Sequence, residues 1–418
     1  MPNKLIGFLA QLGALLSAEQ EPIGPDYARQ DETVKELVDW STSKGGFFHP
    51  HVQIRRWNLS DPTSYFGAFL NGPVKKDDLL MRIPGDIKLQ LHTDFWTNSS
   101  IVDEVVCELA WLLKHEYDNG TKSIYKPYID YIKTQSKHQI PVMWSTKGKK
   151  LLEKVQVDID LRDLNADEDS GSHFHNWIDQ WYGSEDCLYD TETDQELEKW
   201  FLAMAQQRGY DYALIPIYDM LNHDPGNVNT ITRPSIYDTN GFGVYALRDM
   251  EAGEELLYDY YDCPDCKRCE TCGSSSSYWG TPEMLRDFGF VEAHPHKYHF
   301  YEGELSVTLI IDKDRDDGSY KVSCTNKCPS TKEIERHYNK LLPLLEKDIL
   351  PLSETLPSDE YFMIKMYYDT LVTDFKQYLD HPESAIVTRV KYDTPPDKTT
   401  FEATTTVRTS TAGKGADL

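Results

Sequence analysis

The spacing of apolar residues predicts a helix and a buried strand in the first part of the chain. Apolar side chains recur every three or four positions between residues 101 and 115, as on one face of a helix: Val102, Val105, Val106, Leu109, Leu112 and Leu113. Leu79–Ile83 is instead a mostly apolar run closed by Pro84, which predicts a buried strand with a sharp end. Residues 147–210 are expected to continue helical.

Strand patterns return in the second half of the chain. Phe242, Val244 and Ala246 alternate with other residues, and the apolar pair Leu256–Leu257 follows a turn at Ala252–Gly253. Before them, Leu214–Gly226 is an apolar run that ends abruptly on Asp-x-x-Asn-His, with Pro-Gly just beyond. Buried strands and helices do not usually end on Asn-His, so this ending predicts one side of a functional site.

The last third of the chain predicts helices followed by a polar tail. Ser330 and Glu333 form a capping-box pattern, which predicts the start of a helix. Pro343 is expected to kink or end this helix. A second helix is expected to start at Ser358, with one apolar face made of Ile364, Tyr368, Leu371, Phe375 and Tyr378. Residues 391–418 are rich in threonine and poor in apolar residues, which predicts disorder.

Together these patterns predict an α+β protein in the order strands, helical insert, strands, helical lobe. No glycine-rich nucleotide fingerprint lies between a strand and a helix, which disfavours a doubly wound sheet. The chain has 418 residues, 43 basic and 69 acidic, and a net charge of −26. This charge repels nucleic acid and would attract a cationic partner such as a lysine-bearing peptide. The alternative interpretation is that the charge only keeps the protein soluble. No apolar run reaches the roughly 18–20 residues that span a bilayer.

The N-terminus supports two interpretations, and the compartment therefore stays open. Residues 1–18 have the pattern of a short secretory signal with cleavage near Ala18, and also that of an amphipathic helix packed on the domain. Three Asn-x-Ser/Thr sequons, at Asn58, Asn98 and Asn119, matter only if the chain is secreted. Entry into the secretory pathway or a plastid, and residence in the cytoplasm or nucleus, all remain compatible with this sequence.

Several motifs, in order, resemble those of the SET-domain methyltransferases. Phe66–Phe69 leading to Ile83-Pro84 is similar to the first SET motif, and Cys107–Leu113 to a helical insert. Thr281–Val291 is similar to the closing motif of one subclass. That subclass includes the plant Rubisco large-subunit lysine methyltransferase and animal relatives that act on lysine or histidine. The resemblance implies a SET domain over residues 46–292 with a helical insert at about 93–210, followed by an α-helical substrate-binding lobe over 300–385.

The resemblance also implies a site. Tyr260, within Gly253–Tyr261, matches the catalytic tyrosine of the family. Asn222 and His223 match the pair that binds the adenosine of S-adenosylmethionine, largely through backbone atoms, and Tyr260 also contributes to the cofactor pocket. Arg208 matches an arginine that contacts cofactor and channel.

Two departures from the family pattern affect this implied site. Gly67 and Phe69 match the loop that passes the cofactor, but the first glycine of Gly-x-Gly is replaced by Tyr65. Phe288 and Tyr258 match positions on the substrate side of the site. Many relatives have tyrosine where this chain has Phe288. The lost hydroxyl leads to the hypothesis that the site leaves room for higher methylation states.

The implied activity is S-adenosylmethionine-dependent N-methylation of a protein substrate with an accessible lysine. An apolar channel and a nearby sulfonium both favour the neutral amine that this displacement needs. Histidine is an alternative target within the subclass. The altered glycine loop keeps open a further alternative, a catalytically inactive SET protein that acts as a protein-binding module. The sequence identifies neither the substrate protein nor the oligomeric state.

A cysteine cluster follows directly after Gly253–Tyr261 and supports several interpretations. Its members are Cys263, Cys266, Cys269 and Cys272. Structural zinc, disulfides, and free thiols or an iron–sulfur centre are all compatible with this spacing. Cys324 and Cys328 are expected to pair with each other or with the cluster. The two His-Pro-His sequences, His49–His51 and His294–His296, are expected to be loop residues and not metal ligands.

Overall fold

The computed structural model describes part of the chain, and all structural statements below concern this part. It comprises residues 31–58, 64–91, 102–136, 139–156, 195–210, 213–234, 240–260, 280–302, 305–325, 327–382 and 385–388. The predicted signal, the cysteine cluster at 263–272 and the predicted disordered tail lie outside the described residues. Among the described helices, none combines the length and the apolar character that crossing a bilayer requires.

A four-stranded antiparallel sheet forms one layer of the N-terminal part. Its strands, in spatial order, are β1 (Phe47–Phe48), β4 (Leu79–Ile83), β10 (Phe242–Ala246) and β9 (Thr230–Pro234). The predicted strand at 79–83 is therefore confirmed, and it lies inside the sheet with three of its five side chains buried. The alternation predicted for 242–246 is confirmed as well, since Val244 and Ala246 are buried and point to the core.

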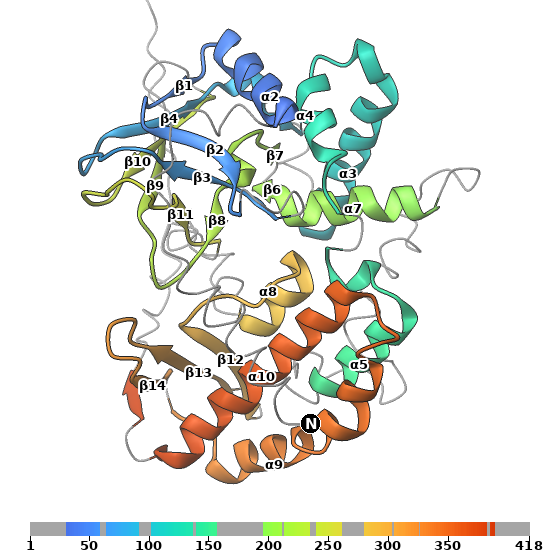
Figure 1. Ribbon diagram of the computed structural model, residues 1–418, viewed down its shortest axis with the longest axis vertical. Helices are drawn as coiled ribbons and strands as arrows, with labels where there is room; N and C mark the ends of the chain where they lie inside the picture. The colour runs from blue at the N-terminus through green and yellow to red at the C-terminus, as the bar shows by residue number, and fades with distance from the viewer. Residues whose placement is uncertain are drawn as a thin grey trace, which may run out of the picture.

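Three smaller sheets surround this layer (Figure 1). They are the antiparallel pair β2 (Val52–Arg56) and β3 (Phe66–Leu70), the sheet of β5 (Leu89–Gln90), β7 (Ala213–Leu214) and β6 (Gly209–Tyr210), and the parallel pair β8 (Asn222–His223) and β11 (Leu257–Tyr258). The parallel pair matters most for function. It aligns Leu257 with Asn222 and Tyr258 with His223, which brings two distant segments of the chain side by side.

Helices cover one side of these sheets. They are α2 (Glu32–Ser43), α3 (Val102–Asn119), α4 (Lys126–Ile132) and α7 (Gln195–Arg208), and α3 packs along α7 (Figure 1). The predicted apolar stripe of α3 is confirmed where side chains are described, since Val105, Val106, Leu109 and Leu113 are buried. The α2 helix follows the capping pattern, because the Asp31 side chain accepts a hydrogen bond from the backbone N–H of Val34.

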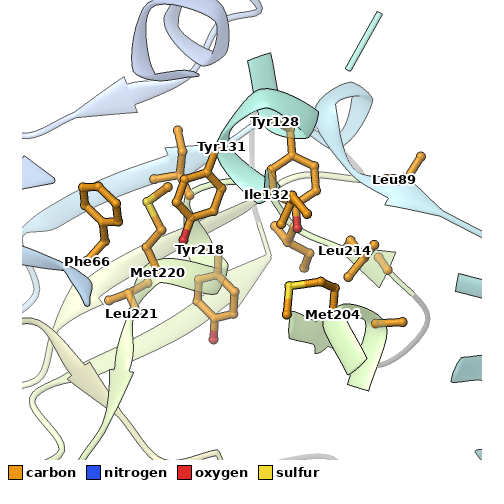
Figure 2. Packing of buried hydrophobic residues seen from close by; sticks show 14 of the residues in the cluster. Phe66, Leu89, Tyr128, Tyr131, Ile132, Met204, Leu214, Tyr218, Met220 and Leu221 are labelled. Carbon is orange, nitrogen blue, oxygen red and sulfur yellow. The ribbon is translucent and has the colours of Figure 1, made fainter. Parts of the chain in front are cut away.

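One hydrophobic core joins the helices to the strands. It contains residues from both halves of the chain, and Figure 2 shows Tyr128, Tyr131 and Ile132 of α4 facing Leu214, Tyr218 and Met220. Burial of large side chains of this kind stabilises a fold by about 1.5–3 kcal/mol each. The core lies directly behind the Leu214–Gly226 segment, so it holds the predicted Asn-His ending in place.

The C-terminal part differs from the predicted helical lobe. Its first element is α8 (Thr281–Phe288), and a sheet follows in the order β12 (His296–Glu302), β13 (Leu305–Lys313), β14 (Tyr320–Thr325) and β15 (Ile386–Thr388). An entirely α-helical lobe over 300–385 is therefore wrong. The missed signal is the strict alternation of Val307, Leu309 and Ile311, all of which are buried on one face of β13.

The two helices predicted at the end of the chain are confirmed. The α9 helix (Thr331–Leu341) starts after Ser330, whose hydroxyl accepts from the backbone N–H of Glu333, and it ends two residues before Pro343. The α10 helix (Ser358–Asp380) buries the predicted face. A second hydrophobic core unites α9, α10 and the sheet with α5 (Thr146–Gln156). One helix of the predicted insert therefore packs against the C-terminal part (Figure 1).

Candidate functional site

A single cavity of about 350 Å³ unites residues from the two separated motifs. Five of the predicted site residues line it: Arg208, Asn222, His223, Tyr260 and Phe288. The rest of its wall comes from the end of α4 and the loop after it, from Tyr65 and Phe66 at the start of β3, from Gln207 of α7, from Asp219 and Met220, and from the segment after α8. Its volume falls in the range of small-molecule and cofactor sites.

His223 is held in a fixed tautomer by two partners. Its Nδ1 accepts a hydrogen bond of 3.0 Å from the backbone N–H of Tyr260. Its Nε2 lies 2.9 Å from a carboxylate oxygen of Glu292, and the side chains of His223 and Glu292 are fully buried. Because Nδ1 is the acceptor, Nε2 carries the proton and donates to the carboxylate. His223 therefore connects Tyr260, which lies just after β11, to the segment after α8.

Tyr260 presents its hydroxyl to the turn before the Asn-His pair. The hydroxyl donates a 2.9 Å hydrogen bond to the backbone oxygen of Leu221. Burial raises the pKa of Tyr260 above its ordinary value, so the hydroxyl stays protonated at neutral pH. Its ring lies 4.8 Å from that of Tyr258 and 4.9 Å from that of Phe288, measured between centroids. The tyrosine can thus place and polarise a ligand but does not act as a base.

The turn before Asn222 contains a strained residue. Ile217 is fully buried and has φ 72°, a backbone conformation that β-branched residues rarely adopt. Such a conformation costs on the order of 1–3 kcal/mol and persists only where the surrounding structure holds it. Tyr218–Met220 forms a short 3-10 turn directly afterwards. The strain thus occurs where the chain turns its backbone toward the cavity.

Arg208 forms a buried network on the opposite wall. Its Nη1 lies 3.2 Å from a carboxylate oxygen of Asp219 and 3.0 Å from the hydroxyl of Tyr131, and its Nη2 lies 2.7 Å from the side-chain oxygen of Gln135. Tyr128 donates a further hydrogen bond of 2.9 Å to Asp219. Burial raises the pKa of Asp219, and the charge of Arg208 and these hydrogen bonds act in the lowering direction.

Asn222 uses its side chain to close the floor of the site. Its amide donates to the backbone oxygen of Phe66 at 3.0 Å and to the carboxylate of Glu255 at 2.6 Å. A Cβ atom on Gly67 would lie 2.4 Å from that carboxylate and 2.9 Å from the Asn222 amide, so this position admits only glycine without a rearrangement. Burial raises the pKa of Glu255 to about 7, against the lowering effects of Asn222 and Arg55.

Three predicted site residues do not line the cavity. Gly67 lies behind Asn222, and the ring of Tyr258 packs at a tilt against the rings of Tyr260 and Tyr218. Phe69 is buried beneath the guanidinium of Arg55, 3.7 Å from its ring centroid. Tyr65, in place of the first family glycine, does line the cavity. This residue is 48% exposed, and its ring stacks on that of Trp57 with centroids 6.0 Å apart.

Several polar residues of the cavity wall, among them Gln139, Gln207 and Asp219, were not predicted from the sequence as site residues, whereas Arg208 was. The side-chain oxygens of Gln139 and Gln207, one carboxylate oxygen of Asp219 and Nε of Arg208 are buried and have no hydrogen-bond partner within the described structure. Asp219 stood inside the recognised Leu214–Gly226 segment, but the two glutamines carry no local signal. Only the approach of the loop after α4 to the end of α7 makes them part of the site.

The His-Pro-His sequences have different structures. His49–His51 lies outside helices and strands, as expected, whereas His296 begins β12 and is buried, so the loop prediction is wrong there. Nδ1 of His296 lies 2.7 Å from Asp374, and its Nε2 lies 3.0 Å from the backbone oxygen of Glu292. Burial lowers the pKa of His296, but Asp374 outweighs this effect and raises it. Because both ring nitrogens face acceptors, the ring is expected to be protonated and to form an ion pair with Asp374.

The cysteines are only partly described. Cys324 and Cys328 form a disulfide, which confirms the first of the two pairings expected for them. Cys107 is also disulfide-bonded, and no described cysteine is free. The cluster at 263–272 lies outside the described residues, so a zinc site there stays a prediction.

Part of the chain matches a known protein family. The family model described as the SET domain matches residues 66–261. Among solved structures, the chain is similar to Rubisco LSMT bound to AdoMet, with 12% identity and a TM-score of 0.45 over 84% of this chain and 92% of that one. It is also similar to the SET domain of LSMT bound to lysine and AdoHcy, with 11% identity, a TM-score of 0.45 and the same coverage. A search of curated proteins found no match.

Proposed function

We propose that this chain, a mixed α+β SET-domain protein, is an S-adenosylmethionine-dependent protein N-methyltransferase that acts on lysine side chains. The observation that carries the proposal is the shared cavity. Tyr260, the Asn222–His223 pair and Arg208 belong to separate segments of the chain, yet all line the same space. Each matches a family position with a role in cofactor binding or catalysis.

The reaction requires a neutral amine and accurate placement. Lysine has an ordinary pKa of about 10.4, so removing its proton at pH 7 costs about 4.6 kcal/mol. A buried aromatic wall disfavours the ammonium form, because it withdraws the charge from water. Phe288 and Phe290, which are half-buried, would form part of such a wall beside Tyr260. Bound S-adenosylmethionine would supply the electrophilic methyl group, whose C–S bond breaks as the amine nitrogen attacks.

Tyr260 would contribute orientation and electrostatics. Its hydroxyl stays protonated and already donates to the backbone oxygen of Leu221, so its remaining lone pair is available to a polarised ligand. The backbone oxygen of Asp219 accepts from Arg208, which orients a second carbonyl in the same turn. Groups fixed before the reaction do not need to reorganise during it, and this lowers the barrier.

The residues of the cavity fit an S-adenosylmethionine ligand. Such a ligand has an amino group, a carboxylate, ribose hydroxyls and an adenine ring, and it therefore requires both donors and acceptors. The buried atoms without partners on Gln139, Gln207, Asp219 and Arg208 include both kinds. Arg208 would bind the carboxylate, Asn222 and His223 the adenosine. Because Gly67 has no side chain, the side chains of Asn222 and Glu255 pack directly against its backbone on this side of the pocket.

The finer architecture is part of the proposal. We propose that the helices within residues 93–210 form the insert of the SET fold. The C-terminal part, with its sheet and with α9 and α10, would form the substrate-binding lobe. The chain has 26 more negative than positive charges, which favours a basic substrate segment.

The experiment is methyl labelling with tritiated S-adenosylmethionine. Purified full-length protein is incubated with extract, and the labelled band is digested and mapped. Tyr260→Phe is expected to lose most of the labelling while retaining thermal stabilisation by the cofactor. The matched control Tyr338→Phe, on α9 and remote from the cavity, should label normally. A label on histidine would replace lysine as the target residue.

The alternative of an inactive protein-binding module makes a different prediction. Its motivating feature is Tyr65, which lines the cavity where the family has glycine. Half of this side chain faces solvent, which supports access of a cofactor past it. If S-adenosylmethionine raises the melting temperature of neither the wild type nor Tyr65→Gly, the enzyme proposal is refuted and the binding module is favoured.

A further inference from the structure

The described cysteines indicate an oxidising compartment. Cys324 lies in the middle of β14, is fully buried and is bonded to Cys328 in the following loop. Cys107 of α3 is disulfide-bonded as well. Reducing compartments keep thiols free, whereas disulfides form and persist in the secretory pathway and outside the cell. Cys324 belongs to the folded core, and its partner Cys328 is half-buried.

One sequon lies entirely within the described residues. Asn119-Gly120-Thr121 begins at the last residue of α3 and continues into a short 3-10 turn. The side chain of Asn119 makes no capping hydrogen bond to that turn, and Thr121 is exposed. A Cβ added to Gly120, which has φ 54°, would meet no atom within 4 Å. Asn119 itself is half-buried, and the sequon lies at the surface with open space beside Gly120.

An exposed aromatic pair precedes the sequon on the same helix. Trp111 is 54% exposed, and its ring stacks on that of His115 with centroids 5.7 Å apart and an interplanar angle of 13°. Residues 111, 115 and 119 are two successive steps of four, so they follow one side of the helix, away from the buried stripe. Eight residues rise about 12 Å along the axis. Helical side chains also lean toward the N-terminus, which directs Asn119 toward the pair.

We propose that Asn119 carries an N-linked glycan whose first sugars cover the Trp111–His115 pair. The side-chain nitrogen of Asn119 attacks C1 of the first N-acetylglucosamine of a lipid-linked oligosaccharide. The C1–N bond forms, the C1–O bond to the lipid pyrophosphate breaks, the lipid pyrophosphate leaves, and the nitrogen loses one proton. The C–H groups on a sugar face then pack on the indole ring, whose face is electron-rich. This proposal does not depend on the proposed methyl transfer.

Occupancy is tested in a eukaryotic host that expresses the full chain. Thr121→Ala removes the sequon and leaves Asn119 in place, whereas Thr121→Ser keeps the sequon and is the matched control. Purified protein is treated with peptide N-glycosidase, and the peptide containing residue 119 is examined by mass spectrometry. Wild type and Thr121→Ser should show Asn119 converted to aspartate, and Thr121→Ala should not. Peptide mapping without reductant should recover the Cys324–Cys328 bond.

Two results overturn the proposal. One is a wild-type peptide with unmodified Asn119, and the other is alkylation of both Cys324 and Cys328 without prior reduction. Packing on the indole is tested by thermal unfolding before and after glycan removal under native conditions. Removal should lower the melting temperature of the wild type by about 2 °C, the scale of one lost surface contact in a large domain, and should leave Trp111→Ala unchanged. If glycan removal lowers the melting temperature of the wild type and of Trp111→Ala by the same amount, the glycan does not pack on Trp111.

Discussion

Glu255 should make folding stability fall as pH rises, and Glu255→Gln should remove this effect. The carboxylate is largely buried behind Asn222, and burial raises its pKa to about 7 from an ordinary value of 4.5. Between these values the folded chain binds the proton and the unfolded chain releases it. Stability is therefore highest below about pH 4.5, decreases up to about pH 7 and stays lower above it. Glutamine keeps the oxygen that accepts from Asn222 but does not titrate.

The size of the effect follows from the two pKa values. At 1.36 kcal/mol per pH unit, the difference between 4.5 and about 7 corresponds to about 3.4 kcal/mol in total. Most of this develops between pH 5 and pH 8, where the expected loss is about 2.5 kcal/mol. Other groups titrate in the same range, but they are shared by wild type and variant. The difference between the two proteins therefore isolates Glu255.

The assay is urea unfolding of both proteins at pH 5 and pH 8. Relative to wild type, Glu255→Gln should gain about 2.5 kcal/mol of unfolding free energy on going from pH 5 to pH 8. Glu254→Gln is the control. Burial acts to raise the pKa of Glu254, but Arg248 and a hydrogen bond from the backbone N–H of Glu251 together lower it, so this variant should show no gain at high pH. If Glu255→Gln and wild type change in parallel between the two pH values, the buried-carboxylate argument is wrong.

Four further predictions concern the site and the cysteine cluster. Gly67→Ala should weaken S-adenosylmethionine binding at least about tenfold in calorimetry, since its Cβ would lie 2.4 Å from Glu255 and displace Asn222; unchanged affinity would contradict the close-packed floor. Asp219→Asn should cost about 3 kcal/mol in urea unfolding, because Arg208 would remain buried without its counter-charge. Phe288→Tyr should shift products toward lower methylation in mass spectrometry, and an identical distribution would end that hypothesis. Purified protein should contain about one zinc if Cys263–Cys272 bind the metal, and disulfides within that segment would argue against it.

Much of the local structure followed from the sequence because its causes are local. The stripe of α3, the run of β4 before Pro84 and the Ser330 cap each depend on residues within a few positions of one another. The missed C-terminal sheet shows the limit. The alternation of β13 was present, but its strand partners and the helices around it decide whether such a segment is buried.

The sequence by itself determined the SET-type motifs, their order and the prediction that Asn222, His223 and Tyr260 belong to one site. Only the tertiary structure decided what holds them there. The parallel pairing of β8 and β11 puts Tyr258 opposite His223, and Glu292, 69 positions after His223, binds its Nε2. Gln139 and Gln207 likewise became part of the cavity wall only through packing. The physical reason is that hydrogen bonds and burial depend on distance in space, whereas periodicity and capping depend on distance along the chain.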